Sequence, residues 1–162
     1  MQANVSSQRK TMTIVWFALL ATVGIYVVIG YVLSAQREGA SELTDSVLMV
    51  LGAMAVGSAA LSFYLPKLLL ANQDVRERIA RVGRAAEAAP AEREARLEEL
   101  AKVYFTPWVV GAALAESVAI FGLVAAFLSG SGDLMLPFAL VSLAILLVKR
   151  PRVETLLPPA QR

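Results

Sequence analysis

The 162-residue chain carries 15 Lys and Arg and 13 Asp and Glu residues, and 57% of its residues are hydrophobic. This composition is too apolar for an ordinary soluble domain, and four long stretches carry almost no charge, so we predict an integral membrane protein. Cysteine and histidine are both absent, which excludes disulfides, thiolate or imidazole metal sites and Ser-His-Asp arrangements. We therefore expect no metal, no cofactor and no enzymatic activity. The basic residues flank the apolar stretches without forming a basic domain, so we expect no nucleic-acid binding.

The first apolar stretch covers residues 13–33 and holds no charged residue. At about 1.5 Å per residue, a helix of this length covers the roughly 30 Å hydrocarbon core of a bilayer. A cleaved signal peptide is the alternative, but its apolar region is typically only about 7 to 15 residues long. A retained span is therefore favoured. The second stretch covers residues 47–65 and is followed by Pro66 and Lys67.

The third stretch covers residues 104–128 and the fourth covers residues 134–148. Thr106 and Pro107 suit the cap and first turn of the third helix, and we expect Tyr104 and Trp108 to anchor it at the membrane interface. The fourth stretch is short for a full crossing, so it must pack beside longer helices, borrow flanking residues or thin the bilayer. The sequence thus predicts an all-α fold, a four-helix transmembrane bundle that forms one integral membrane domain.

The Lys and Arg residues predict how this bundle is oriented. They are concentrated at the amino end, in residues 71–103 and at the carboxyl end, whereas residues 34–46 hold one and residues 129–133 hold none. Cytoplasmic segments carry the excess of Lys and Arg. We therefore expect a multi-pass protein of the plasma (inner) membrane with both termini and residues 71–103 in the cytoplasm.

Residues 71–103 are too long for a simple connection and are predicted to form two short helices. Pro90 ends the first helix, and the second, in which Glu98 pairs with Lys102, runs into the third span. Four arginines lie on or near the first helix: Arg76, Arg78, Arg81 and Arg84. One interpretation is a solvated helical hairpin, and the other is a surface that contacts anionic lipid or a partner protein.

Glu116 is the ionisable residue at the midpoint of the third span. An ionised carboxylate at the bilayer centre costs about 2.5 to 3.5 kcal/mol on insertion scales, and no basic residue is expected at that depth to offset it. We therefore expect the neutral acid, which needs hydrogen-bond partners. Four hydroxyl-bearing residues lie at a similar depth in the other spans: Thr22, Tyr26, Ser58 and Ser142.

Small residues predict close helix packing around this acid. In the third span they include Gly111 and Gly122, and in the second span Gly52 and Gly57. Small residues let two membrane helices approach closely. The second and third spans are therefore predicted to pack on one another.

Residues 114–127 read Leu-Ala-Glu-Ser-Val-Ala-Ile-Phe-Gly-Leu-Val-Ala-Ala-Phe. This segment resembles the carboxylate-bearing helix of the rotor-ring c subunit of F-type and V-type ATP synthases, which commonly reads Ala-Leu-x-Glu-Ala-x-x-Ile-Tyr-Gly-Leu-Val. In that family the glutamate reversibly binds a proton or sodium ion, and the preceding helix is glycine-rich. The resemblance implies an ion-binding role for Glu116 and a packing role for Gly122. It is confined to this segment.

Two functions follow as expectations. In the first, the chain handles a proton or cation at Glu116, as a homo-oligomer or within a membrane complex. In the second, it is a non-transporting scaffold or accessory subunit in which Glu116 is a structural hydrogen-bond tie between helices. Membrane lipids are the partners expected in both.

Overall fold

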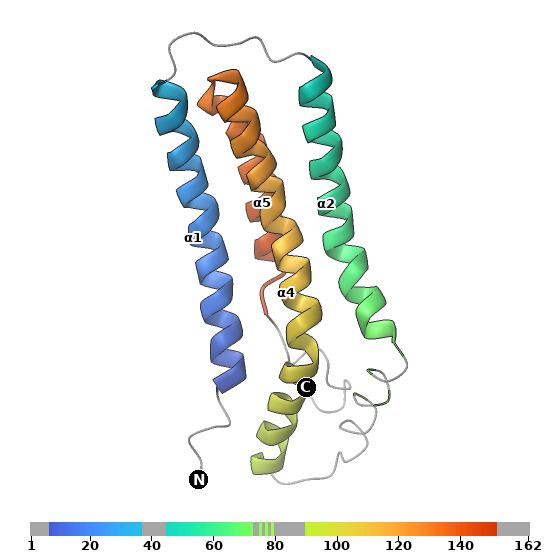
Figure 1. Ribbon diagram of the computed structural model, residues 1–162. Coiled ribbons are helices and arrows are strands. Elements are labelled where there is room, and N and C mark those ends of the chain that lie inside the picture. The colour runs from blue at the N-terminus through green and yellow to red at the C-terminus, as the bar shows by residue number, and fades with distance from the viewer. Residues whose placement is uncertain are drawn as a thin grey trace.

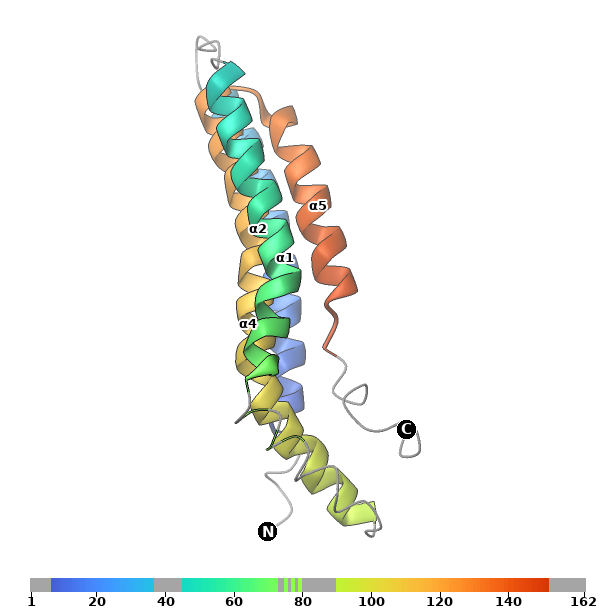
Figure 2. The ribbon, with the colours of Figure 1, turned by 90° about the vertical axis from the view of Figure 1, so that its right-hand side faces the viewer.

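The computed structural model describes residues 7–36, 45–72, 75, 77, 79 and 90–151. The elements in this part of the chain are all helical: α1 (Ser7–Ala35), α2 (Asp45–Ala71), α4 (Pro90–Ser129), the 3-10 turn η1 (Gly132–Leu134) and α5 (Met135–Val148). Figure 1 shows α4 between α1 and α2, and Figure 2 shows α5 on one side of these three helices. The prediction of an all-α fold is confirmed for the described residues.

Three of the helices contain segments long and apolar enough to cross a membrane: Lys10–Ala35, Asp45–Ala71 and Glu98–Ser129. Each helix continues past the predicted apolar stretch, because backbone hydrogen bonding does not stop where charged side chains begin. The apolar helix Gly132–Val148 is shorter. The 14 residues of α5 rise about 21 Å, less than the roughly 30 Å of a hydrocarbon core.

The long helix α4 holds the bundle together. It packs against α2, α5 and α1, whereas α1 and α2 make almost no contact with one another within their described ranges. Its buried face is made of small residues, including Ala112, Ala115 and Ala119, which let the neighbouring helices approach closely. The core therefore forms around α4 and not at a common centre of four equal helices.

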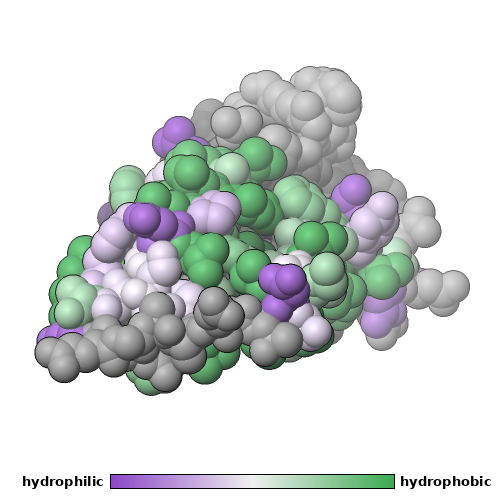
Figure 3. Space-filling view, turned by 90° about the horizontal axis from the view of Figure 1, so that it is seen from above, coloured by the Kyte–Doolittle hydropathy of each residue, from purple (hydrophilic) through white to green (hydrophobic). Residues whose placement is uncertain are grey.

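Large apolar side chains cover the outside of the bundle. Phe17 on α1, Val56 on α2 and Leu140 on α5 are more than half exposed. Seen from above, apolar residues reach the outer rim among polar ones (Figure 3). A soluble monomer rarely exposes so much contiguous apolar surface, so this surface fits contact with lipid chains.

Two expectations about the start of the third span are wrong. Thr106 and Pro107 lie inside α4 and do not begin a helix, because α4 already starts at Pro90. An interior proline lacks an N–H and crowds the preceding turn, which bends a helix, and α4 changes direction along its length in Figure 2. Trp108 is no interfacial anchor either, since it is only 3% exposed.

Two buried indoles instead hold the carboxyl end of α5. Trp108 Nε1 donates a hydrogen bond of 2.8 Å to the carbonyl oxygen of Lys149, and Trp16 Nε1 on α1 donates one of 2.8 Å to that of Leu146. The last carbonyls of a helix have no partner within the helix, and leaving them unpaired in an apolar environment is costly. The two indoles provide partners for carbonyls at the end of a helix too short to reach both membrane surfaces.

Candidate functional site

Glu116 lies on the side of α4 that faces α1. Its side chain is half-buried, and the phenolic hydroxyl of Tyr26 donates a hydrogen bond of 3.2 Å to Glu116 Oε1. Tyr26 is half-buried as well and packs against the core cluster that includes Ala112, Ala115 and Ala119. One carboxyl group and one hydroxyl group from two helices therefore form the polar centre of the candidate site.

The other three hydroxyl-bearing residues predicted around Glu116 are not brought to it. Thr22 donates to the carbonyl oxygen of Ala18, one turn earlier in α1, over 2.9 Å. Ser142 on α5 is fully buried, and its hydroxyl has no hydrogen-bond partner among the described residues. Ser58 lies half-buried on α2. The predicted cluster is thus a Tyr26–Glu116 pair within the described part of the chain.

Gly111 and Gly122 are points of close helix approach. A Cβ atom added to Gly111 would lie 2.7 Å from Pro66 Cγ and 2.9 Å from the carbonyl oxygen of Ser62 on α2. At Gly122 it would lie 2.5 Å from Phe138 Cβ on α5. All three distances are shorter than ordinary van der Waals contacts, so these glycines allow α4 to approach two different helices.

Gly52 and Gly57 do not have the packing role predicted for them in the single chain. An added Cβ at either position would meet no atom within 4 Å. Gly57 is on the exposed side of α2, and Gly52 borders an open groove. α2 and α4 do pack on one another, and Gly111, not Gly52 or Gly57, marks a close approach between them.

The predicted arginine surface cannot be placed, because its members lie outside the described residues: Arg76, Arg78, Arg81 and Arg84. Within the described ranges no three Asp or Glu side chains are grouped so that they could hold a metal ion.

Glu98 has a role that the sequence did not reveal. Its side chain is buried, and its Oε1 accepts a hydrogen bond of 3.0 Å from the backbone N–H of Gln8, in the first turn of α1. The expected partner was Lys102, which is exposed. Spacing along one helix suggests the Lys102 pair, whereas the contact with Gln8 depends on how α1 and α4 dock.

A second interhelical bond near the opposite end of the bundle also went unpredicted. Tyr31 on α1 donates a hydrogen bond of 2.9 Å to Asp133 Oδ1 in η1. A Cβ added to Gly132 would lie 2.6 Å from the Tyr31 ring, so the turn fits closely over this tyrosine.

Comparisons of the chain with protein-family models, with curated proteins and with solved structures found no match.

Proposed function

We propose that the chain crosses the membrane four times with both ends in the cytoplasm, and that Glu116 and Tyr26 form its protonatable site. The observation that carries the site is the hydrogen bond from the Tyr26 hydroxyl to Glu116 Oε1. Intramembrane acids are costly and commonly mark proton or ion pathways. The resemblance of residues 114–127 to the rotor-ring c subunit supports the same role, and it supports assembly into an oligomer.

A proton is the ion that this pair fits best. Hard metal cations such as Ca²⁺ and Mg²⁺ take six or more oxygen ligands, whereas Tyr26 and Glu116 offer one carboxyl and one phenol. A single carboxyl can take up or release a proton without a full coordination shell. Because Glu116 is half-buried, it is not sealed inside the bundle.

Carbodiimide labelling tests the protonatable site. We expect dicyclohexylcarbodiimide, which reacts with protonated carboxyl groups, to label the full chain in liposomes faster at lower pH. Glu116→Gln should reduce labelling to background, whereas Asp133→Asn, at an exposed acid, should leave it unchanged. Mass spectrometry of the labelled peptide provides the readout. Labelling that survives Glu116→Gln, or that does not depend on pH, would contradict this function.

The same hydrogen bond also supports the second function, in which Glu116 ties α1 to α4 in a scaffold or accessory subunit. We expect Tyr26→Phe to cost about 0.5 to 1.5 kcal/mol of unfolding free energy, because it removes one interhelical hydrogen bond. Tyr64→Phe, at an exposed tyrosine of α2, is the control and should cost less. Unfolding in mixed detergent micelles measures both.

Glu116 variants separate the two functions. If the acid is only a tie, Glu116→Gln should be mild, Glu116→Leu should lower stability, and carbodiimide should not label the wild-type chain at Glu116. If the acid exchanges protons, wild-type labelling should be found whatever the stability of the variants.

A further inference from the structure

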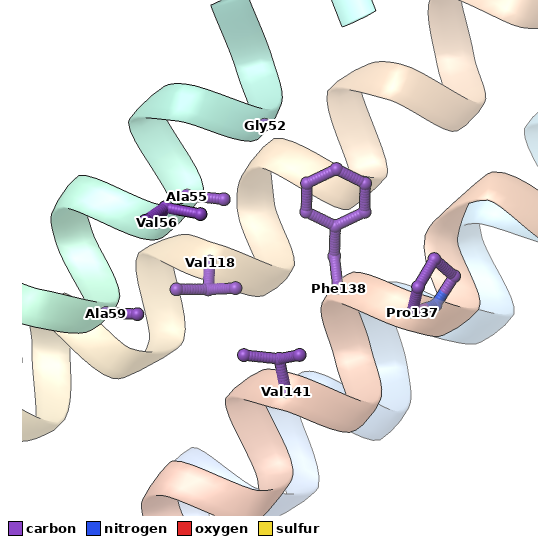
Figure 4. Close-up of a pocket in the computed structure, with 8 residues that line it drawn as sticks. All are labelled: Gly52, Ala55, Val56, Ala59, Val118, Pro137, Phe138 and Val141. Atoms are coloured by element: carbon purple, nitrogen blue, oxygen red, sulfur yellow. The ribbon is translucent and has the colours of Figure 1, made fainter. Parts of the chain in front are cut away.

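An apolar groove opens between α2 and α5. Its volume is about 290 Å³, and it lies between Gly52 and Ala59 on α2 and Phe138 and Val141 on α5, with Val118 of α4 between the two walls (Figure 4). All of its lining residues are apolar. The groove is distinct from the Tyr26–Glu116 pair, which lies between α1 and α4.

The groove exists because α2 and α5 make few contacts with one another. Gly52 contributes no side chain, and an added Cβ there would meet nothing within 4 Å. The space is about ten times the roughly 30 Å³ that one water molecule occupies in the liquid, yet no polar side chain is present to hold water. In a bilayer, an open apolar space of this kind is filled by a hydrocarbon chain.

Two lysines, Lys67 and Lys149, lie beyond one end of the groove. They continue the line along which α2 and α5 face one another, which we call the α2–α5 seam. Lys149, which follows α5, donates a hydrogen bond to the carbonyl oxygen of Ser62, and its Nζ lies 4.7 Å from the centre of the Phe63 ring. Ser62 and Phe63 are one helical turn beyond Ala59 on α2. Lys67 lies one further turn along the helix.

The two lysines are close enough to repel one another. Burial, and secondly the positive charge of Lys67, lower the pKa of Lys149 below its usual value. No carboxylate of the described residues contributes to this shift. A negatively charged group between the lysines would remove the repulsion and replace part of the lost hydration.

We propose that this seam binds one anionic phospholipid, with its phosphate between Lys67 and Lys149 and one acyl chain in the α2–α5 groove. Lys67 is about 12 Å along the helix axis from Ala59 and about 22 Å from Gly52. The half of a bilayer core is about 15 Å thick, so the end of an acyl chain whose phosphate is at Lys67 reaches the groove. Basic pockets between membrane helices bind anionic headgroups in this manner.

Native mass spectrometry of the full chain in detergent tests the headgroup site. We expect dioleoylphosphatidylglycerol to bind at least about fivefold more tightly than dioleoylphosphatidylcholine, a preference of about 1 kcal/mol in total, which is the contribution of a single basic residue near an anionic headgroup. Lys67→Gln and Lys149→Gln should each remove most of this preference. Lys102→Gln, at an exposed lysine of α4, makes the same charge change away from the seam and should leave the preference intact. Equal binding of the two lipids, or an equal loss in Lys102→Gln, would overturn the proposal.

A pair of glycine variants tests the acyl-chain site. Gly52→Leu places a side chain in the groove, whereas Gly57→Leu adds the same side chain on the exposed side of α2, and both positions have open space for it. Only Gly52→Leu should weaken dioleoylphosphatidylglycerol binding, and neither should change the weak binding of glycerol 3-phosphate, which carries the phosphate without a tail. If the two leucine variants behave alike, or if Gly52→Leu changes the oligomeric state and not lipid binding, the groove does not hold a lipid tail.

Discussion

At the scale of single residues, the position of a side chain around its helix decides what it can do. Counting along each span gave the depth of Thr22, Ser58 and Ser142, but depth does not say which neighbour a side chain faces. Thr22 donates a hydrogen bond within its own helix, and Ser142 is buried with no hydrogen-bond partner in the part of the chain that the structure describes. Glu116 could be identified from the sequence because an ionisable residue in an apolar span stands out whichever way its side chain faces around the helix. Its contact with Tyr26 could not be predicted without knowing how α1 and α4 face one another.

The glycines of α4 give a prediction at this scale. We expect Gly111→Ala and Gly122→Ala each to cost about 1 to 3 kcal/mol of unfolding free energy, because the new methyl group would overlap α2 or α5. Gly57→Ala is the matched control, since its methyl group meets open space and alanine favours the helix by about 0.5 to 1 kcal/mol. Unfolding in mixed detergent micelles measures all three. Similar effects at the three positions would contradict the close approaches described.

At the scale of elements, the sequence located the apolar core of each helix better than its ends. Hydropathy marked only residues 104–128, whereas α4 runs from Pro90 to Ser129, and it was the charge spacing around Glu98 and Lys102 that predicted a helix running into the third span. Its charged amino-terminal part remains helical because it docks against α1, where Glu98 accepts a hydrogen bond from Gln8. Leu100 and Ala101 are buried in the same region with Met12 of α1. Tertiary packing of this kind leaves no mark on hydropathy.

The Glu98 contact predicts a local effect on α1. A carboxylate that bonds a first-turn N–H also interacts favourably with the positive end of the helix dipole. We expect Glu98→Ala to cost about 0.5 to 2 kcal/mol and to speed hydrogen exchange at the first amides of α1. Glu99→Ala changes the neighbouring exposed acid and should do neither. Equal exchange in the two variants would show that the contact contributes nothing to α1.

At the scale of the whole molecule, membrane topology follows from charge and is open to direct measurement. The chain has no cysteine, so single cysteines report position without further changes. We expect Gln36→Cys and Ser131→Cys to react with an impermeant maleimide added outside intact cells. Lys10→Cys and Lys102→Cys should react only after the cells are opened, because the proposed topology places the basic segments in the cytoplasm. Labelling of Lys10→Cys or Lys102→Cys in intact cells, or a lack of labelling of Gln36→Cys or Ser131→Cys, would contradict the four crossings.

The central place of α4 has a consequence for how the protein is made. Because α1 and α2 barely touch, nothing within the described helices joins them until α4 lies between them. In a two-stage view, helices first insert singly and then associate. A nascent chain halted before Pro90 would therefore be a pair of separate anchors in the bilayer, and cooperative folding would begin only with the insertion of the next apolar helix.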